Sequence, residues 1–213
     1  MRKLTFPDPH RRKHFDFFRA MDMPHFSICL QLDITETLRL VRSENLHFTS
    51  TIVYLVSRTA NNIAPFRQRI RGEAAVEHEQ VHPSFTVQTR VSDVFSFCQV
   101  NYLEDYVAFA TASRVAIERM QNQPSFEDEA GRDDLLFLSS FPWGRFTGLT
   151  HAMHYSPVDS VPRITWGKFY EQGKRVLMPL SVQAHHALVD GKHVGQYCEL
   201  FESLASETSL WIP

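Results

Sequence analysis

The residues best able to do chemistry lie within residues 178–204. His185 and His186 come directly after an alternating apolar segment that is typical of a β-strand. Asp190 and Gly191 follow four and five residues after His186, and an apolar stripe of helical period comes next. A strand, the pattern H-H-x-x-x-D-G and a helix together hold an imidazole at a strand end. An imidazole held there can serve as a general base.

Asp190 and Gly191 have two interpretations. Aspartate is a favoured N-cap residue and glycine adopts unusual backbone angles, so the pair can simply begin the helix. Asp190 is also close enough in sequence to orient the loop that carries the base. The residues alone leave both interpretations open.

The composition is that of an ordinary globular protein, with 213 residues, 43% hydrophobic residues and a net charge of −2. The basic excess that nucleic acids or membrane surfaces demand is missing, so we expect neither partner. Three widely spaced cysteines indicate no disulfide framework, no metal site and a cytoplasmic location. No segment has the features of a signal peptide or a membrane span. We expect one domain over residues 1–213.

The apolar patterning predicts helices that alternate with strands. Strands are expected at residues 26–34, 85–91, 94–97, 135–138, 146–153, 163–170 and 175–182, and a hairpin at 66–78. Helices are expected near residue 15, after Thr35, and at 48–63 and 101–120, with a surface loop at 121–132. The predicted fold class is α/β, a two-layer sandwich with helices on one face of a large, mixed, mostly antiparallel sheet.

Six short segments of the chain carry further motifs. Residues 185–191, 11–15, 31–35, 81–83, 139–143 and 165–168 read HHALVDG, RRKHF, QLDIT, VHP, SSFPW and TWGK. Together these segments resemble the motifs of the chloramphenicol acetyltransferase family, within the coenzyme-A-dependent acyltransferases. The resemblance covers nearly the whole chain. It implies the fold of those acyltransferases, acetyl-CoA as co-substrate without a metal, and a homotrimer with active sites between subunits.

The resemblance also implies the catalytic residues. His186 matches the general base that takes a proton from an acceptor hydroxyl, such as one of chloramphenicol. Ser139 matches the serine that stabilises the oxyanion of the tetrahedral intermediate. Asp190 matches an aspartate that forms a sheltered salt bridge with an N-terminal arginine, here Arg11. His185 is expected to support the loop.

The binding residues follow from the same resemblance. Thr165 matches a threonine that helps to place a water molecule near the acceptor. Phe26 and Phe95 match aromatic residues of the acceptor pocket, although core packing explains them almost as well. His151 and Met153 lie in a stretch expected to form another wall of that pocket. Coenzyme A is expected to contact Lys168, Phe169 and Trp143.

The chain departs from the family motifs at three places. His151 stands in a stretch that is rich in aliphatic residues in drug-modifying members, which would make the acceptor pocket more polar. Val189 replaces a common cysteine, and Phe169 replaces a frequent tyrosine near the adenine. Two alternatives therefore stay open, namely an O-acetyltransferase for another hydroxyl acceptor and a non-catalytic trimeric protein that binds a hydrophobic ligand.

Overall fold

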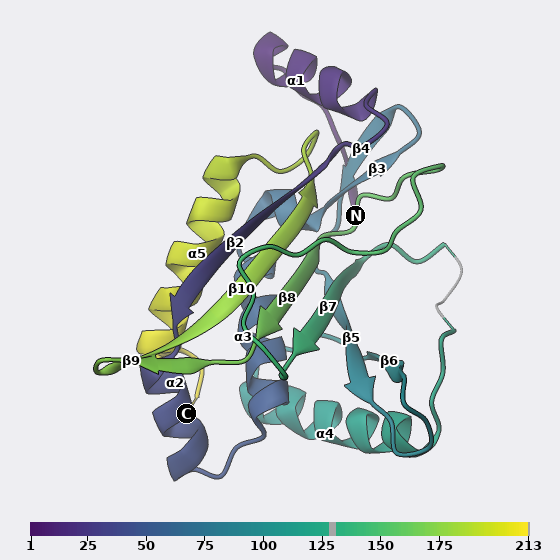
Figure 1. Ribbon diagram of the computed structural model, residues 1–213. Helices are drawn as coiled ribbons and strands as arrows, with labels where there is room; N and C mark the ends of the chain where they lie inside the picture. Colours follow the sequence, from purple (N-terminus) through teal and green to yellow (C-terminus); the bar gives the residue numbers. More distant parts are fainter. Residues whose placement is uncertain (128–130, 213) are drawn as a thin grey trace.

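A large mixed sheet forms the centre of the molecule (Figure 1). The computed structural model describes residues 1–127 and 131–212. The sheet has the strand order β2-β10-β8-β7-β5-β6, and β9 pairs with the outer part of β10. Its members are β2 (His25–Asp33), β5 (His82–Gln88), β6 (Phe95–Gln99), β7 (Leu135–Phe141), β8 (Arg163–Gly167), β9 (Tyr170–Gln172) and β10 (Arg175–His185). The pairs β5–β7 and β7–β8 are parallel, and the other pairs are antiparallel.

Strand β10 is the longest strand and pairs with β2, β8 and β9. Its residues alternate between the two faces of the sheet, as in any strand. Leu180, Val182 and Ala184 belong to the hydrophobic core. Ser181 and Gln183 lie between them, on the opposite face, and are also buried. The sheet therefore has one apolar face and one polar face, and both are covered.

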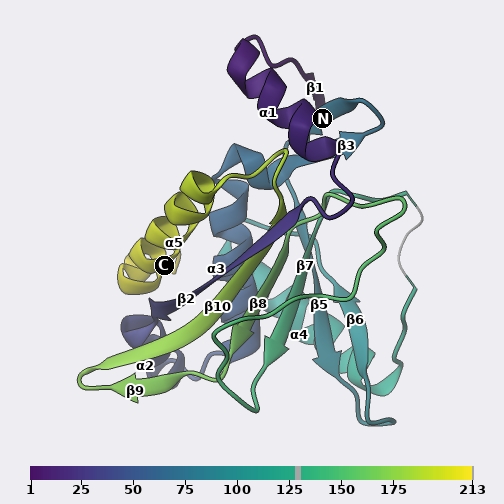
Figure 2. The same ribbon diagram turned by 45° about the horizontal axis from the view of Figure 1, so that its top comes forward.

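Helices cover the apolar face. They are α2 (Thr35–Ser43), α3 (Phe48–Asn61), α4 (Tyr106–Asn122) and α5 (Gly191–Ser206). Figures 1 and 2 show these helices on one side of the sheet, whereas the coil of residues 142–162 crosses the other side. Helix α3 is buried along most of its length, because its apolar residues meet both the sheet and the neighbouring helices α4 and α5.

A smaller unit lies at the end of the sheet where β10 terminates. It contains α1 (Pro9–Arg19), a short helical turn η1 (Ala64–Arg67) and a three-stranded sheet of β1 (Arg2–Leu4), β3 (Gln68–Arg71) and β4 (Ala74–Glu77). Gly72 has a φ of +60° in the β3–β4 turn, a conformation that favours glycine. Phe15 of α1 is fully buried and joins this unit to the main core.

The predicted fold class is confirmed, and so are most of the predicted elements. The strand predicted at residues 146–153 is wrong, since these residues form coil. Its alternating pattern has no strand to pair with, because β8 already has β7 on one side and β10 on the other. The segment instead binds the sheet through side chains of the polar face, for example Ser27 Oγ, which donates to Leu149 O at 3.1 Å.

Several boundaries also differ from the predictions. The predicted strand 85–91 ends at Gln88, and α4 begins at Tyr106 because the Asp105 side chain caps it by accepting from Ala108 N. The side chain of His47 caps α3 by accepting from Ser50 N. The predicted loop at 121–132 includes residues 128–130, which lie outside the described part of the chain.

Arg69 is fully buried and joins the small sheet to the main one. Its guanidinium donates to the carbonyls of Phe66, Gln68, Asp133 and Leu135 at 2.5 to 2.9 Å. Burial lowers its pKa to about 10, so the side chain stays charged at neutral pH.

We predict that Arg69→Leu lowers the free energy of unfolding by about 3–5 kcal/mol, because several buried carbonyls lose their donor. Urea denaturation monitored by circular dichroism measures this loss. Arg71→Leu is the matched control, since the Arg71–Asp133 pair is partly exposed and should contribute less than about 1 kcal/mol. Equal losses in the two variants would contradict the assignment.

Candidate active site

His186 lies just beyond β10, in the turn that leads to α5. Its backbone N–H donates to Pro24 O at 2.8 Å, and its Nδ1 lies 3.2 Å from Val189 O. A carbonyl oxygen only accepts, so Nδ1 carries the proton of the neutral ring. Nε2 is then the unprotonated nitrogen and can take a proton from another molecule.

Aromatic rings fix the plane of this imidazole. Phe18 of α1 stacks on His186 with centroids 3.9 Å apart and an interplanar angle of 25°, and Phe26 of β2 lies 4.5 Å away. His14 meets the ring edge-on at 5.5 Å. Sequence reasoning anticipated Phe26 as a pocket residue but missed Phe18 and His14. The apolar side of the helix predicted near residue 15 was the available signal for Phe18.

The side chain of Arg11 supports the turn by binding backbone carbonyls of the turn. The guanidinium donates to Ala187 O at 2.9 Å, to Leu188 O at 3.0 Å and to His14 Nδ1 at 3.0 Å. Burial lowers the pKa of Arg11, and the nearby charge of Asp190 opposes that shift. Arg11 therefore lies beside the candidate base, where it binds the carbonyls of the turn.

The predicted salt bridge between Arg11 and Asp190 does not form among the described residues. Asp190 is the N-cap of α5, where its carboxylate accepts from Lys192 N at 3.2 Å. This hydrogen bond is the main reason why the pKa of Asp190 is lowered. The carboxylate is half exposed and lies 3.7 Å from His14 Nε2, so it is not sheltered. The N–H groups of the first turn of α5 have no partner within the helix, so the carboxylate of Asp190 caps them. Arg11 already has carbonyl acceptors in the turn.

His185 supports the turn from inside the protein, as expected. Its side chain is 2% exposed, and its Nδ1 accepts from Ala187 N at 3.2 Å. His25 is paired with His185 across the two strands, and both of its ring nitrogens are buried with no hydrogen-bond partner within residues 1–127 and 131–212. Burial lowers the pKa of each of these histidines to about 4, so both are neutral at pH 7.

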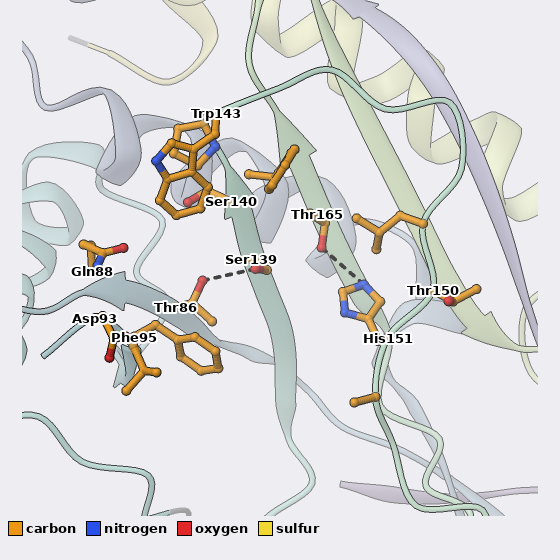
Figure 3. Close-up of a pocket in the computed structure, with 15 residues that line it drawn as sticks. Thr86, Gln88, Asp93, Phe95, Ser139, Ser140, Trp143, Thr150, His151 and Thr165 are labelled. Carbon is orange, nitrogen blue, oxygen red and sulfur yellow. Dashed lines mark hydrogen bonds between the residues drawn. The ribbon is translucent and has the colours of Figure 1, made fainter.

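A cavity of about 470 Å³ opens on the polar face of the sheet, toward the other end of β8 and β7. Ser139 of β7 and Thr165 of β8 are direct neighbours in the ladder, and both line the cavity (Figure 3). Phe95, His151 and Trp143 line it too, so these five predicted site residues come together. Ser139 Oγ lies 3.2 Å from the hydroxyl oxygen of Thr86.

Thr165 does not present a free hydroxyl to the cavity. Its Oγ1 lies 3.2 Å from His151 Nε2, so the group predicted to place a water molecule is paired with a side chain (Figure 3). Burial, and next the charge of Arg163, lower the pKa of His151 to about 4. The part of the cavity wall that His151 forms is polar and uncharged at neutral pH.

Three further predicted binding residues, Met153, Lys168 and Phe169, are not among the residues that line the cavity. The Met153 sulfur accepts from Gln183 Nε2 at 3.3 Å, and Phe169 packs against Phe48 at 5.4 Å. The exposed Lys168 is positioned by its backbone N–H, which donates to Gly144 O. The cavity also has polar lining residues that sequence reasoning missed, namely Thr86, Gln88, Asp93, Ser140 and Thr150.

One chain does not bring His186 to Ser139. Ser139 pairs with Thr165, and Thr165 pairs with Ser181, which precedes His186 by five residues. Five residues of strand span roughly 16 Å, and two strand spacings add about 10 Å at right angles, so the two residues lie roughly 19 Å apart. The candidate base and the cavity are therefore separate features of a single subunit.

A sequence model described as chloramphenicol acetyltransferase matches residues 3–201. The chain belongs to the chloramphenicol acetyltransferase family. A family member from Proteus mirabilis is 31% identical over 196 residues, which cover 89% of this chain and 90% of that protein. Chloramphenicol acetyltransferase 2 from Haemophilus influenzae is also 31% identical over 196 residues, which cover 92% of both chains. The prediction of an acyltransferase enzyme is confirmed by this membership.

Solved structures agree with the fold of the family. A chloramphenicol acetyltransferase superposes with a TM-score of 0.84 at 22% identity, covering 95% of this chain and 99% of the other. The cubic core of the pyruvate dehydrogenase multienzyme complex superposes with a TM-score of 0.69 at 16% identity, covering 97% and 93%. No helix within residues 1–127 and 131–212 is long and apolar enough to cross a membrane.

The ligand atoms of His14, His186 and Asp190 lie within 4.8 Å of one another, a spacing that can suit a metal ion. The hydrogen bond from Arg11 to His14 Nδ1 opposes this use, because it places the ring proton on Nε2, the nitrogen that faces Asp190. The guanidinium charge opposes a cation as well. This cluster is better suited to orienting His186 than to binding a metal.

The Arg11 contacts predict a weak energetic coupling to Asp190. In a double-mutant cycle of Arg11→Leu and Asp190→Asn, we expect a coupling in unfolding free energy below about 0.5 kcal/mol. The matched cycle of Arg163→Leu and Asp159→Asn breaks a direct pair at 2.6 and 2.9 Å, and its coupling should exceed about 1 kcal/mol. A large coupling in the first cycle would restore the predicted salt bridge.

The neutral histidines predict a stability that falls in mild acid. The folded pKa of His25 and of His185 is about 4 against an ordinary value of 6.5, so the unfolded chain binds more protons between these values. The contribution of these two histidines to the free energy of unfolding is thus fully present above pH 6.5 and is lost as the pH falls toward 4. The charges nearest the pair, on Asp159 and Arg163, act in opposite directions on the pKa of His25.

Urea denaturation at a series of pH values measures this effect. Between pH 4 and 6.5, the free energy of unfolding of His25→Asn should change less steeply with pH than that of the wild-type protein. The control His154→Asn, at an exposed histidine, should keep the wild-type slope. Identical slopes in the wild-type protein and His25→Asn would contradict the prediction.

Proposed function

We propose that this protein is an acetyl-CoA-dependent O-acetyltransferase with chloramphenicol as acceptor. The acceptor comes from the names of its relatives, and one observation supports the chemistry. His186 offers an unprotonated Nε2 held by stacked rings and by Val189 O, while Ser139 offers a hydroxyl inside a cavity. A base and an oxyanion donor are the two groups that transfer from a thioester to a hydroxyl requires. Such an activity would give antibiotic resistance in the cytoplasm.

The reaction needs no covalent enzyme intermediate. The acceptor oxygen attacks the thioester carbonyl carbon while His186 Nε2 takes the hydroxyl proton. The new C–O bond gives a tetrahedral oxyanion, to which Ser139 Oγ donates a hydrogen bond. The C–S bond then breaks, the ester leaves as product, and the thiolate of coenzyme A takes the proton from His186.

Other residues would bind the two substrates. Phe95, His151 and Thr165 lie around the cavity and would contact the acceptor. Trp143 is 70% exposed beside the same cavity, where its ring can cover the pantetheine arm or the adenine of coenzyme A. Lys168 follows β8 directly and would face the phosphates, and Phe169 lies next to it in sequence.

The active site would form between two subunits of a homotrimer. The distance of roughly 19 Å between His186 and Ser139 supports this arrangement, because the reaction needs both groups within reach of one carbonyl. The edge strand β2 supports it too. It has nine residues and no lysine or internal proline, and within residues 1–127 and 131–212 no other strand pairs with its outer edge. Each chain would act as one domain and contribute to two sites.

The polar wall of the cavity favours a second candidate, an O-acetyltransferase for a more polar alcohol. His151, Gln88 and Asp93 distinguish this wall from a purely hydrophobic one. Release of free thiol from acetyl-CoA, measured with a panel of alcohols beside chloramphenicol, separates the two candidates. The binding-protein alternative predicts no thiol release with any of them.

We predict that His186→Ala lowers kcat by about a hundredfold or more, since the general base is lost, while chloramphenicol still binds. Ser139→Ala should lower kcat by about 10²–10³ through loss of the oxyanion donor. Thiol release measures the rate, and calorimetry measures binding. His154→Ala is a control, because that histidine is exposed and belongs neither to the turn nor to the lining of the cavity. Full activity of His186→Ala would overturn the proposed mechanism.

Mixed oligomers test the shared site. His186→Ala and Ser139→Ala chains, unfolded together and refolded as a mixture, would form sites in which the base comes from one variant and the serine from the other. Random assembly makes about one quarter of the sites complete. Activity of the mixture should therefore approach that fraction of wild type, while each variant refolded alone stays inactive. An inactive mixture would contradict a site between subunits.

A further inference from the structure

His151 is held rigidly over the cavity by two strands. Its backbone N–H donates to Gln183 Oε1 of β10 at 3.2 Å, and its Nε2 lies 3.2 Å from Thr165 Oγ1 of β8. Gln183 and Thr165 are 4% and 2% exposed, so neither anchor moves freely. The ring is therefore oriented before any ligand arrives.

The second ring nitrogen of His151 is available to a ligand. Nδ1 has no hydrogen-bond partner among the residues that the structure describes, and it is not sealed in the protein interior. Figure 3 shows it turned away from Thr165, on the side of the ring that faces Ser139 and Phe95. A group bound between these residues would meet Nδ1.

The imidazole is neutral at physiological pH, because burial lowers its pKa to about 4. One ring nitrogen then donates and the other accepts, and the hydroxyl of Thr165 can complement either state. Nδ1 therefore faces the cavity as a donor or as an acceptor. A hydroxyl group of a ligand can pair with both forms. An apolar group there would leave Nδ1 unpaired and would be disfavoured.

The sheet also fixes where that hydroxyl must lie. Ser139 and Thr165 are ladder neighbours, so their backbones are about 4.8 Å apart, and His151 extends the Thr165 side. A hydroxyl that reacts beside Ser139 and a second one that reaches His151 must then be separated by only a few bonds. An alcohol with a 1,2- or 1,3-diol unit has this spacing.

We propose that His151 Nδ1 binds a second hydroxyl of the acceptor, so that the enzyme selects small diols over matched monoalcohols. The proposal rests on the acetyl transfer proposed above. Thr165 is a positioning residue in this scheme, since it acts by orienting the imidazole.

A pair of acceptors tests the proposal. Chloramphenicol carries a primary and a secondary hydroxyl in a 1,3-diol, and its deoxy analogue lacks only the secondary one. The wild-type protein should favour chloramphenicol in kcat/KM by about ten- to a hundredfold. His151→Leu should lose that preference, because its kcat/KM falls about ten- to a hundredfold further on chloramphenicol than on the analogue. Thr165→Val should lower the preference in part.

The control is His154→Leu, which changes an exposed histidine of the same segment and should keep both rates. Equal losses of His151→Leu on the two acceptors would indicate a structural role and overturn the proposal. No thiol release by the wild-type protein with either acceptor would instead refute the proposed acetyl transfer. Calorimetry with the same two compounds then decides. Tighter binding of the diol that depends on His151 supports the proposal, and equal or absent binding refutes it.

Discussion

The candidate base depends on how the turn between β10 and α5 satisfies its backbone. In the part of the chain that the structure describes, the carbonyls of Ala187 and Leu188 have no strand or helix partner, and the guanidinium of Arg11 donates to both. The third carbonyl of the turn, that of Val189, accepts from His186 Nδ1–H. An unpaired buried carbonyl is costly, so these bonds hold the turn in one conformation. The tautomer of His186 is thus a consequence of backbone hydrogen bonding.

The same requirement extends to the polar face of the sheet. Ser181, Gln183 and Thr165 are almost completely buried, although they lie opposite the hydrophobic core. The coil of residues 142–162 covers them and supplies partners, since His151 bonds to both Gln183 and Thr165 and Asp159 bonds to Arg163. The polar residues on this face therefore hold the coil in place through hydrogen bonds. An apolar face would instead need a further layer of helices or strands to cover it. A cavity with polar walls follows from this construction.

The sequence predicted the fold class well because periodicity carries that information. The apolar positions of residues 175–182 and the stripe beyond Val194 identified β10 and α5, and six motifs in register identified the family. The alternation at 146–153 was misleading, because the same pattern suits a coil that buries side chains against a strand. Whether a partner strand is free is a property of the whole sheet, which local sequence does not contain.

The role of Asp190 shows a second limit of the sequence. The resemblance to the family implied an ion pair with Arg11, but the helix that starts at Gly191 offers nearer donors. A carboxylate at an N-cap is stabilised by backbone N–H groups and the helix dipole without any side-chain partner. The guanidinium, in turn, meets carbonyls that only the folded turn exposes to it. Which of two available pairings forms is decided by the backbone groups left unsatisfied. Those groups are known only once the strand and helix ends are placed. The parts of the site that sequence could place are therefore side chains on regular elements, such as Ser139 and Thr165. The pairing that it missed, between Arg11 and the carbonyls of the turn, has backbone atoms as its partners.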